Sequence, residues 1–126
     1  MATGVILKYA DGVDSGWRSE TGTKDDGNHG YVGTIYWRKI GNMVFFFARS
    51  ITLQNALSSQ YATLATDLFG NCKPYGQVTF PAGNPEKFGQ ILINPNSGNL
   101  FFYKTPSENW STTTLISFSG FFLTAA

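Results

Sequence analysis

The single histidine, His29, is the residue best suited to acid–base chemistry, because it follows two acids, Asp25 and Asp26, in a Gly- and Asp-rich stretch. A Ser–His–Asp site needs a pre-organised nucleophile beside its base, and the sequence contains no nucleophile elbow that would present one. Residues 19–30 as a whole are polar and rich in turn-forming residues. We therefore interpret this stretch as a solvated loop and predict no catalytic residue in it.

The acidic and thiol side chains form no recognisable catalytic or metal-binding pattern. A glycoside hydrolase needs two carboxylates flanking the scissile bond, whereas the eight acids are scattered along the chain. Residues 11–14 and 25–28 carry oxygen ligands suited to calcium, but neither matches the twelve-residue EF-hand loop. The single Cys72 can form no disulfide within the chain, and no set of Cys and His has zinc spacing. We expect no cofactor and no metal site; calcium binding at the two turns stays open.

Composition excludes several classes of protein. Nine basic and eight acidic residues give a net charge of +1 and form no runs, so we expect no nucleic-acid partner. The first residues lack the basic and apolar regions of a signal peptide, and the longest apolar run, residues 43–48, is too short to cross a bilayer. We expect one soluble domain that is not exported through a signal peptide and is not inserted into a membrane.

Residues 31–53 give the strongest structural signal, two runs rich in aromatic and β-branched residues joined at Gly41 and Asn42. A two-residue turn with glycine between such runs predicts a tight antiparallel hairpin. The predicted register pairs Ile40 with Met43, Arg38 with Phe45, Trp37 with Phe46, Tyr36 with Phe47 and Ile35 with Ala48.

Both faces of this hairpin are apolar, although a half-solvated sheet would alternate apolar and polar residues. One face carries Tyr36, Ile40, Met43, Phe45, Phe47 and Ile51, and the other carries Ile35, Trp37, Val44, Phe46 and Ala48. We expect a second sheet to cover one face and a neighbouring subunit the other, because large exposed apolar patches mark interfaces. A long loop of the same chain is the alternative cover. The predicted core or interface residues are Tyr36, Trp37, Phe45, Phe46 and Phe47.

The remaining sequence predicts further short strands. A strand at residues 5–9 falls in a lead-in segment, residues 1–14, ahead of a single domain over residues 15–126. Residues 54–66 have a weak helical spacing and are interpreted as a helical turn or an irregular connection. Strands are predicted at residues 75–80, 88–93, 99–104 and 114–124, and the turn-forming residues 94–98 predict that the second and third of them form a hairpin. The last strand is expected inside the sheet, because an exposed hydrophobic edge strand would promote aggregation. The pattern predicts an all-β, single-domain antiparallel β-sandwich of jelly-roll type with at most one short helix.

Several short motifs together resemble one family. They are Gly16-Trp17, Gly33-Thr-Ile-Tyr-Trp-Arg-Lys-Ile-Gly-Asn-Met-Val44, Ala65-Thr-Asp-Leu-Phe-Gly70 with Lys73-Pro74, Gly89-Gln-Ile-Leu-Ile93 with Ser97-Gly-Asn-Leu100, and Phe118-Ser-Gly-Phe-Phe-Leu123. From about Ser15 onward the chain resembles the C-terminal head domain of phage tail-fibre, baseplate or tail-tip receptor-binding proteins. The most specific motif is the Arg-Lys-Ile-Gly-Asn-Met-Val turn, whereas Leu68-Phe69 stands where the family often has Leu-Pro.

The resemblance implies a homotrimeric head that binds a host cell-surface glycan without enzymatic activity. Such a protein is part of the virion, or prophage-encoded, and is made in the bacterial cytoplasm. In trimers of this kind one sheet packs on the threefold axis, which would cover the second face of the hairpin. The alternatives are a structural or assembly protein of the phage tail without a ligand, and a glycan-cleaving enzyme.

A saccharide site is usually an exposed aromatic ring beside amide, carboxylate or guanidinium groups on loops. Trp110 fits this description best, because it lies between polar residues in the loop over residues 105–112. The predicted ligand-binding residues are Trp110, Asn109, Glu108, Tyr103 and Lys104, the last two as the floor of the site. The alternative is a tryptophan that caps the end of the sandwich. Trp17 with Arg18 is a second candidate pair.

Overall fold

The computed structural model describes residues 14–27, 29–57, 60–70, 72–84, 87–105 and 109–124. These residues form eight strands and no helix, and therefore no helix long enough to cross a membrane. The strands are β1 (Arg18–Gly22), β2 (Tyr31–Ile40), β3 (Met43–Leu53), β4 (Tyr61–Ala65), β5 (Val78–Asn84), β6 (Lys87–Ile93), β7 (Leu100–Lys104) and β8 (Ile116–Leu123). The predicted strand at residues 5–9 lies outside the described residues.

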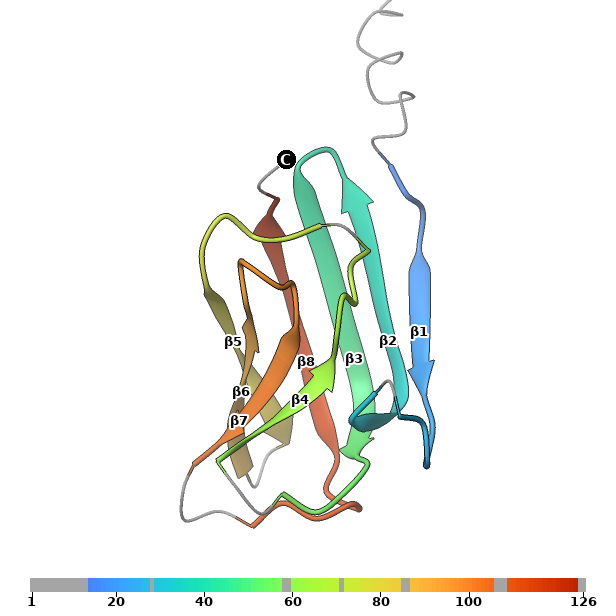
Figure 1. Ribbon diagram of the computed structural model, residues 1–126, viewed down its shortest axis with the longest axis vertical. Coiled ribbons are helices and arrows are strands. Elements are labelled where there is room, and N and C mark those ends of the chain that lie inside the picture. Colours follow the sequence, from blue (N-terminus) through green and yellow to red (C-terminus); the bar gives the residue numbers. More distant parts are fainter. Residues whose placement is uncertain are drawn as a thin grey trace, which may run out of the picture.

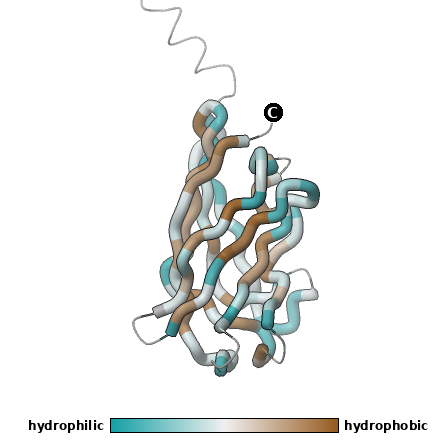
Figure 2. The backbone as a smooth tube through the Cα atoms, turned by 90° about the vertical axis from the view of Figure 1, so that its left-hand side faces the viewer, coloured by the Kyte–Doolittle hydropathy of each residue, from teal (hydrophilic) through white to brown (hydrophobic). Residues whose placement is uncertain are grey.

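The strands belong to one antiparallel sheet with the order β1-β2-β3-β8-β5-β6-β7-β4. The sheet curls, so that β1, β2, β3 and β8 form one layer and β5, β6, β7 and β4 lie across from it (Figure 1). Hydrophobic stretches run along the strands, and hydrophilic residues gather at the turns (Figure 2). The predicted all-β antiparallel, sandwich-like fold is confirmed, and β8 lies inside the sheet, between β3 and β5, as expected for the last strand.

The hairpin of β2 and β3 forms at the predicted turn. Gly41 adopts a φ of 61°, a conformation that a glycine tolerates without steric cost. Four predicted pairs are present, from Ile40 with Met43 to Tyr36 with Phe47. The predicted pairing of Ile35 with Ala48 is absent from the register, because the register shifts by one residue between Val32 and Tyr36.

A second irregularity in β3 changes which side of the sheet one residue occupies. The pairing of β3 with β8 shifts between Ala48 and Ile51, and the two residues in between, Arg49 and Ser50, are both exposed. Strict alternation would put Ile51 on the same side as Phe47, as the sequence predicts. The bulge inserts an extra residue and turns Ile51 into the core, where it is fully buried.

The core lies between the two layers and is rich in aromatic rings. Phe46 is 2% exposed and its ring lies 5.1 Å from that of Phe80 and 5.5 Å from that of Phe69. The rings of Phe118 and Phe122, on the neighbouring strand β8, lie 6.0 and 6.3 Å away. Phe46 therefore joins both layers of the sandwich, and its packing is worth several kcal/mol, about 3–5 by analogy with other buried Phe truncations.

Three local predictions are wrong. Residues 54–66 contain the strand β4 instead of a helical turn, because pairing of this segment with β7 overrides its weak helical spacing. The predicted polar loop at residues 19–30 begins with β1, which pairs with β2. Strand β5 continues through Pro81 to Asn84 instead of stopping before the proline. Proline is compatible with this position because β5 pairs with β8 only at Gly83, so no backbone donor is needed toward β8 at Pro81.

Candidate functional site

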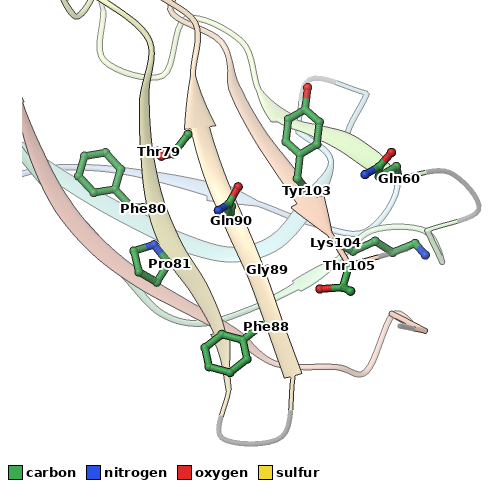
Figure 3. Close-up of a pocket in the computed structure, with 10 residues that line it drawn as sticks. All are labelled: Gln60, Thr79, Phe80, Pro81, Phe88, Gly89, Gln90, Tyr103, Lys104 and Thr105. Atoms are coloured by element: carbon green, nitrogen blue, oxygen red, sulfur yellow. The ribbon is translucent and has the colours of Figure 1, made fainter. Parts of the chain in front are cut away.

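A groove of about 490 Å³ lies on the outer side of β5, β6 and β7. Its size falls within the range of about 300–1,000 Å³ that is usual for ligand pockets. Aromatic, amide, hydroxyl and ammonium groups line it together (Figure 3), among them Gln60, Thr79, Phe88, Gln90, Tyr103 and Lys104.

The strand register explains how residues distant in sequence meet in this groove. Gln90 on β6 pairs with Pro81 on β5 and with Tyr103 on β7, and Tyr103 pairs with Tyr61 on β4. These four residues form a row across the sheet, since opposite residues of paired strands point to the same side. The neighbours Ile91 and Phe102 point the other way and are fully buried. Burial of these apolar neighbours therefore holds Gln90 and Tyr103 on the outer surface.

Two aromatic platforms flank the groove. Tyr61 and Tyr103 stack with their ring centroids 5.2 Å apart and 24° between the ring planes. Phe88 stands at the other end of the groove (Figure 3) and is 75% exposed. Gln90 lies between Tyr103 and Phe88 in this view. The arrangement offers apolar ring faces with an amide between them.

The edge of the groove is held by the backbone. The Lys104 N–H donates to the Gln60 carbonyl at 2.9 Å, which fixes the start of β4 against β7. Gln60, Thr79 and Gln90 are all exposed, so their amide and hydroxyl groups are accessible to a ligand. Apolar ring faces next to such hydrogen-bonding groups match the two kinds of surface that a saccharide presents.

The predicted saccharide residues separate into two groups. Tyr103 and Lys104 line the groove, whereas Trp110 is only 2% exposed. The Trp110 ring meets the Phe102 ring edge-to-face at 4.8 Å, and the Lys87 ammonium lies 5.7 Å from its centroid. The prediction of an exposed Trp110 platform is therefore wrong, and the ring occupies the end of the core, as in the capping alternative.

The loop that carries Trp110 is tied down by its backbone. The Trp110 carbonyl accepts a hydrogen bond from the Leu57 N–H at 3.1 Å, and the exposed Asn109 accepts one from the Lys87 ammonium through its own carbonyl. Burial of the Trp110 ring leaves its Nε1 without a hydrogen-bond partner in the described part of the chain. Glu108 lies outside the described residues.

The outer side of the other layer carries a second, different surface, which we call the aromatic face. Its members are exposed or half-buried apolar side chains on β2, β3 and β8 and just before β1, namely Trp17, Tyr36, Ile40, Met43, Phe45, Phe47, Phe121 and Leu123. Trp17 meets Phe47 edge-to-face at 5.6 Å, and Tyr36 stacks on Phe47 at 5.0 Å. Of the predicted core or interface residues, Tyr36, Phe45 and Phe47 lie here, while Phe46 is in the core and Trp37 is partly buried against it.

One ion pair lies on the aromatic face. Arg38 donates to both carboxylate oxygens of Asp14, at 2.9 and 2.6 Å, and its guanidinium lies 5.8 Å from the centre of the Trp17 ring. The hydrogen bond from Arg38, together with one from the Gly16 N–H, lowers the pKa of Asp14 to about 2. The pair therefore stays charged, and mutually satisfied, at neutral pH. It also fixes the start of the described chain beside β2.

His29 is not solvated as the sequence suggests. Its Nδ1 lies 2.7 Å from an Asp26 carboxylate oxygen, and its Nε2 lies 3.1 Å from a Glu20 oxygen. Its side chain is 17% exposed. Burial opposes protonation, but the hydrogen bonds to Asp26 and Glu20 outweigh it and raise the pKa of His29 above its ordinary value of 6.5. Asp26 was a predicted neighbour; Glu20 was missed, because it reaches His29 only through the pairing of β1 with β2.

Comparison with known proteins adds no family. No protein-family model matches the sequence, and no curated protein matches it. Among the described residues, no group of three His, Cys, Asp or Glu side chains is arranged to hold a metal ion.

Proposed function

We propose that the chain is the receptor-binding head domain of a phage tail fibre or baseplate and recognises a host cell-surface saccharide without cleaving it. The observation that carries the saccharide part is the groove, in which Tyr103, stacked on Tyr61, lies on one side of the Gln90 amide and Phe88 on the other. The phage setting rests on the sequence motifs. Binding, as opposed to cleavage, is supported by the neutral hydrogen-bonding and aromatic character of these four residues.

The aromatic face supports the second part of the proposal, a homotrimer. Exposed apolar patches of this extent on a protein surface usually belong to an interface. The Asp14–Arg38 pair is already satisfied within one chain, so packing against another copy would bury no unpaired charge. With three grooves per trimer, weak binding at each groove would add up to a higher avidity on a repetitive glycan surface.

The proposal is tested by measuring the binding of purified chain to bacterial envelope polysaccharides with Tyr103→Ala. Loss of one ring platform should weaken binding about twofold to tenfold, from roughly 0.5–1.5 kcal/mol of aromatic contact. The matched control is Tyr75→Ala, an exposed tyrosine near the C-terminal end of β8 that does not line the groove. Equal binding by wild type and Tyr103→Ala would remove the groove from the proposal.

The aromatic face also favours a second candidate, a structural or assembly protein of the tail without a ligand. In that case the apolar surfaces serve only to hold subunits together. Binding to host envelope fractions separates the two candidates. Both would form a stable oligomer, but a structural protein would bind no envelope fraction.

A further inference from the structure

The curled sheet is closed at one point by residues 29 and 30. The Gly30 N–H donates to the Leu64 carbonyl on β4 at 2.7 Å, and His29 forms an isolated bridge with Ala65. The approach is so close that a side chain at Gly30 would place its Cβ 2.3 Å from the Thr63 carbonyl oxygen. This contact connects the beginning of β2, in one layer, to the edge strand β4 of the other.

The closing residues are positioned by a cluster that we call the His29 clasp, formed by Glu20, Asp26 and His29. Glu20 comes from β1, Asp26 from the loop after it, and His29 lies between their carboxylates. The ring of Tyr31 on β2 meets the imidazole edge-to-face at 5.3 Å, and its hydroxyl donates to the Glu20 carbonyl at 3.0 Å. The side chain of Gln54 donates to the Asp26 carbonyl at 2.9 Å and so ties the loop to the end of β3.

The chemistry of the clasp depends on one proton. An imidazolium donates a hydrogen bond from both ring nitrogens, whereas a neutral imidazole donates from one and presents a lone pair at the other. Both partners of His29 are carboxylates, which accept hydrogen bonds when ionised. A neutral His29 would therefore turn one lone pair toward a negatively charged oxygen and lose one of its two contacts.

We propose that the His29 clasp is a proton-operated closure: protonated His29 holds Gly30 against β4, and loss of the proton loosens this contact and the β4 edge of the groove. The titratable groups that face His29 are Glu20 from β1, Asp26 from the loop and the Tyr31 hydroxyl from β2. Its neighbours on β4, Leu64 and Ala65, carry none. The link to the groove rests on the proposed function, but the closure itself does not.

Strand β4 is short enough to transmit the change. Gly30 bonds to Leu64 near one end of β4, and Tyr61 at the other end stacks on Tyr103 of the groove. Just before β4, the Gln60 carbonyl accepts from Lys104. A shift of this five-residue strand would therefore move one aromatic platform and the edge of the groove.

The direction of the pH dependence follows from the raised pKa of His29. A group with a raised pKa in the folded state stabilises the closure fully below its unfolded value of about 6.5, and this contribution is lost as the pH rises through the folded pKa. For every unit by which the pKa of His29 is raised, protonation increases the equilibrium constant for closing the Gly30–β4 contact by at most about tenfold.

The test uses the whole chain and NMR, because a single histidine gives an unambiguous C2–H resonance. We expect its titration midpoint above 6.5, and we expect the protection of the Gly30 amide, corrected for intrinsic exchange at each pH, to fall several-fold across the same midpoint. Glu20→Gln should move both midpoints down together, because the imidazolium loses one of its two carboxylate partners. Asp14→Asn removes an equal charge on the aromatic face and should move neither. Constant Gly30 protection while His29 titrates would overturn the proposal.

The regulatory link has a separate readout, the affinity of the groove for an envelope polysaccharide at pH 6 and above the His29 midpoint. Affinity should fall at the higher pH in the wild type, and the fall should occur at lower pH in Glu20→Gln. An affinity independent of pH, combined with loss of Gly30 protection, would overturn the link alone. If Tyr103→Ala has no effect on binding, the groove is removed from the saccharide proposal, and the Gly30 measurement still decides the closure.

Discussion

The two outer surfaces of the sandwich are built by the same alternation of residues along antiparallel strands, yet they differ in kind. The aromatic face combines rings such as Phe45 and Phe121, 6.0 Å apart, with aliphatic side chains, and its Asp14–Arg38 pair is satisfied internally. The groove face interleaves Tyr103 and Phe88 with amide, hydroxyl and ammonium groups and is hollowed. The aromatic face offers few hydrogen-bonding groups to a polar ligand, whereas the groove face presents hydrogen-bonding groups beside its rings. The difference favours a protein partner for the aromatic face and a saccharide for the groove.

The largest expected effect is a loss of stability that differs between a core residue and a residue of the aromatic face. Phe46 and Phe45 are adjacent but point to opposite sides of β3. Phe46→Ala should lower the free energy of unfolding by about 3–5 kcal/mol at any protein concentration. Phe45→Ala should cost less, and its cost should grow with protein concentration if another copy covers this face. Chemical denaturation at two concentrations measures both, and a Phe45→Ala loss independent of concentration would speak against the interface.

The next effect concerns assembly. We expect the wild-type chain to have a solution mass of about 41 kDa, three chains of 13.8 kDa, by light scattering coupled to size exclusion. Phe121→Glu places a charge on the aromatic face and should give a folded monomer, because an unpaired charge is costly to bury. Phe88→Glu, the matched change on the groove face, should leave the mass unchanged. A monomeric wild type would show that the aromatic face is not a trimer interface.

The smallest expected effect concerns the ion pair on the aromatic face. Because the pKa of Asp14 is lowered to about 2, its contribution is complete above the ordinary value of 3.8 and is lost as the pH falls through about 2. The indole N–H resonance of Trp17 should therefore stay constant from pH 7 to 4 and move below that. Asp14→Asn should shift this resonance at neutral pH, with little change in stability, because exposed pairs contribute little. An unchanged resonance in Asp14→Asn would show that Arg38 holds its place over the Trp17 ring without the carboxylate.

Local sequence signals predicted much of the fold. The turn at Gly41 and Asn42, the hairpin of β6 and β7 and the final strand β8 all form where the residues indicate. Two residues that line the groove, Tyr103 and Lys104, were among the site residues predicted from the sequence, and their role in saccharide binding stays a prediction. Phe88 and Gln90 were missed as site residues, because their type and spacing are those of an ordinary half-exposed strand. Nothing local in the sequence shows that β7 also pairs with β4 on its other side.

The sequence by itself determined the class of fold and the two-sided apolar character of the hairpin, because turn residues and alternation act over a few neighbouring residues. The tertiary structure alone decided which side each residue faces after the bulge at Arg49 and Ser50, why Trp110 is buried, and that Glu20 reaches His29. These outcomes depend on register between strands far apart in the chain, and a shift of one residue moves a side chain to the opposite face. The groove and the aromatic face, to which we assign the proposed functions, are therefore set by pairing across the sheet.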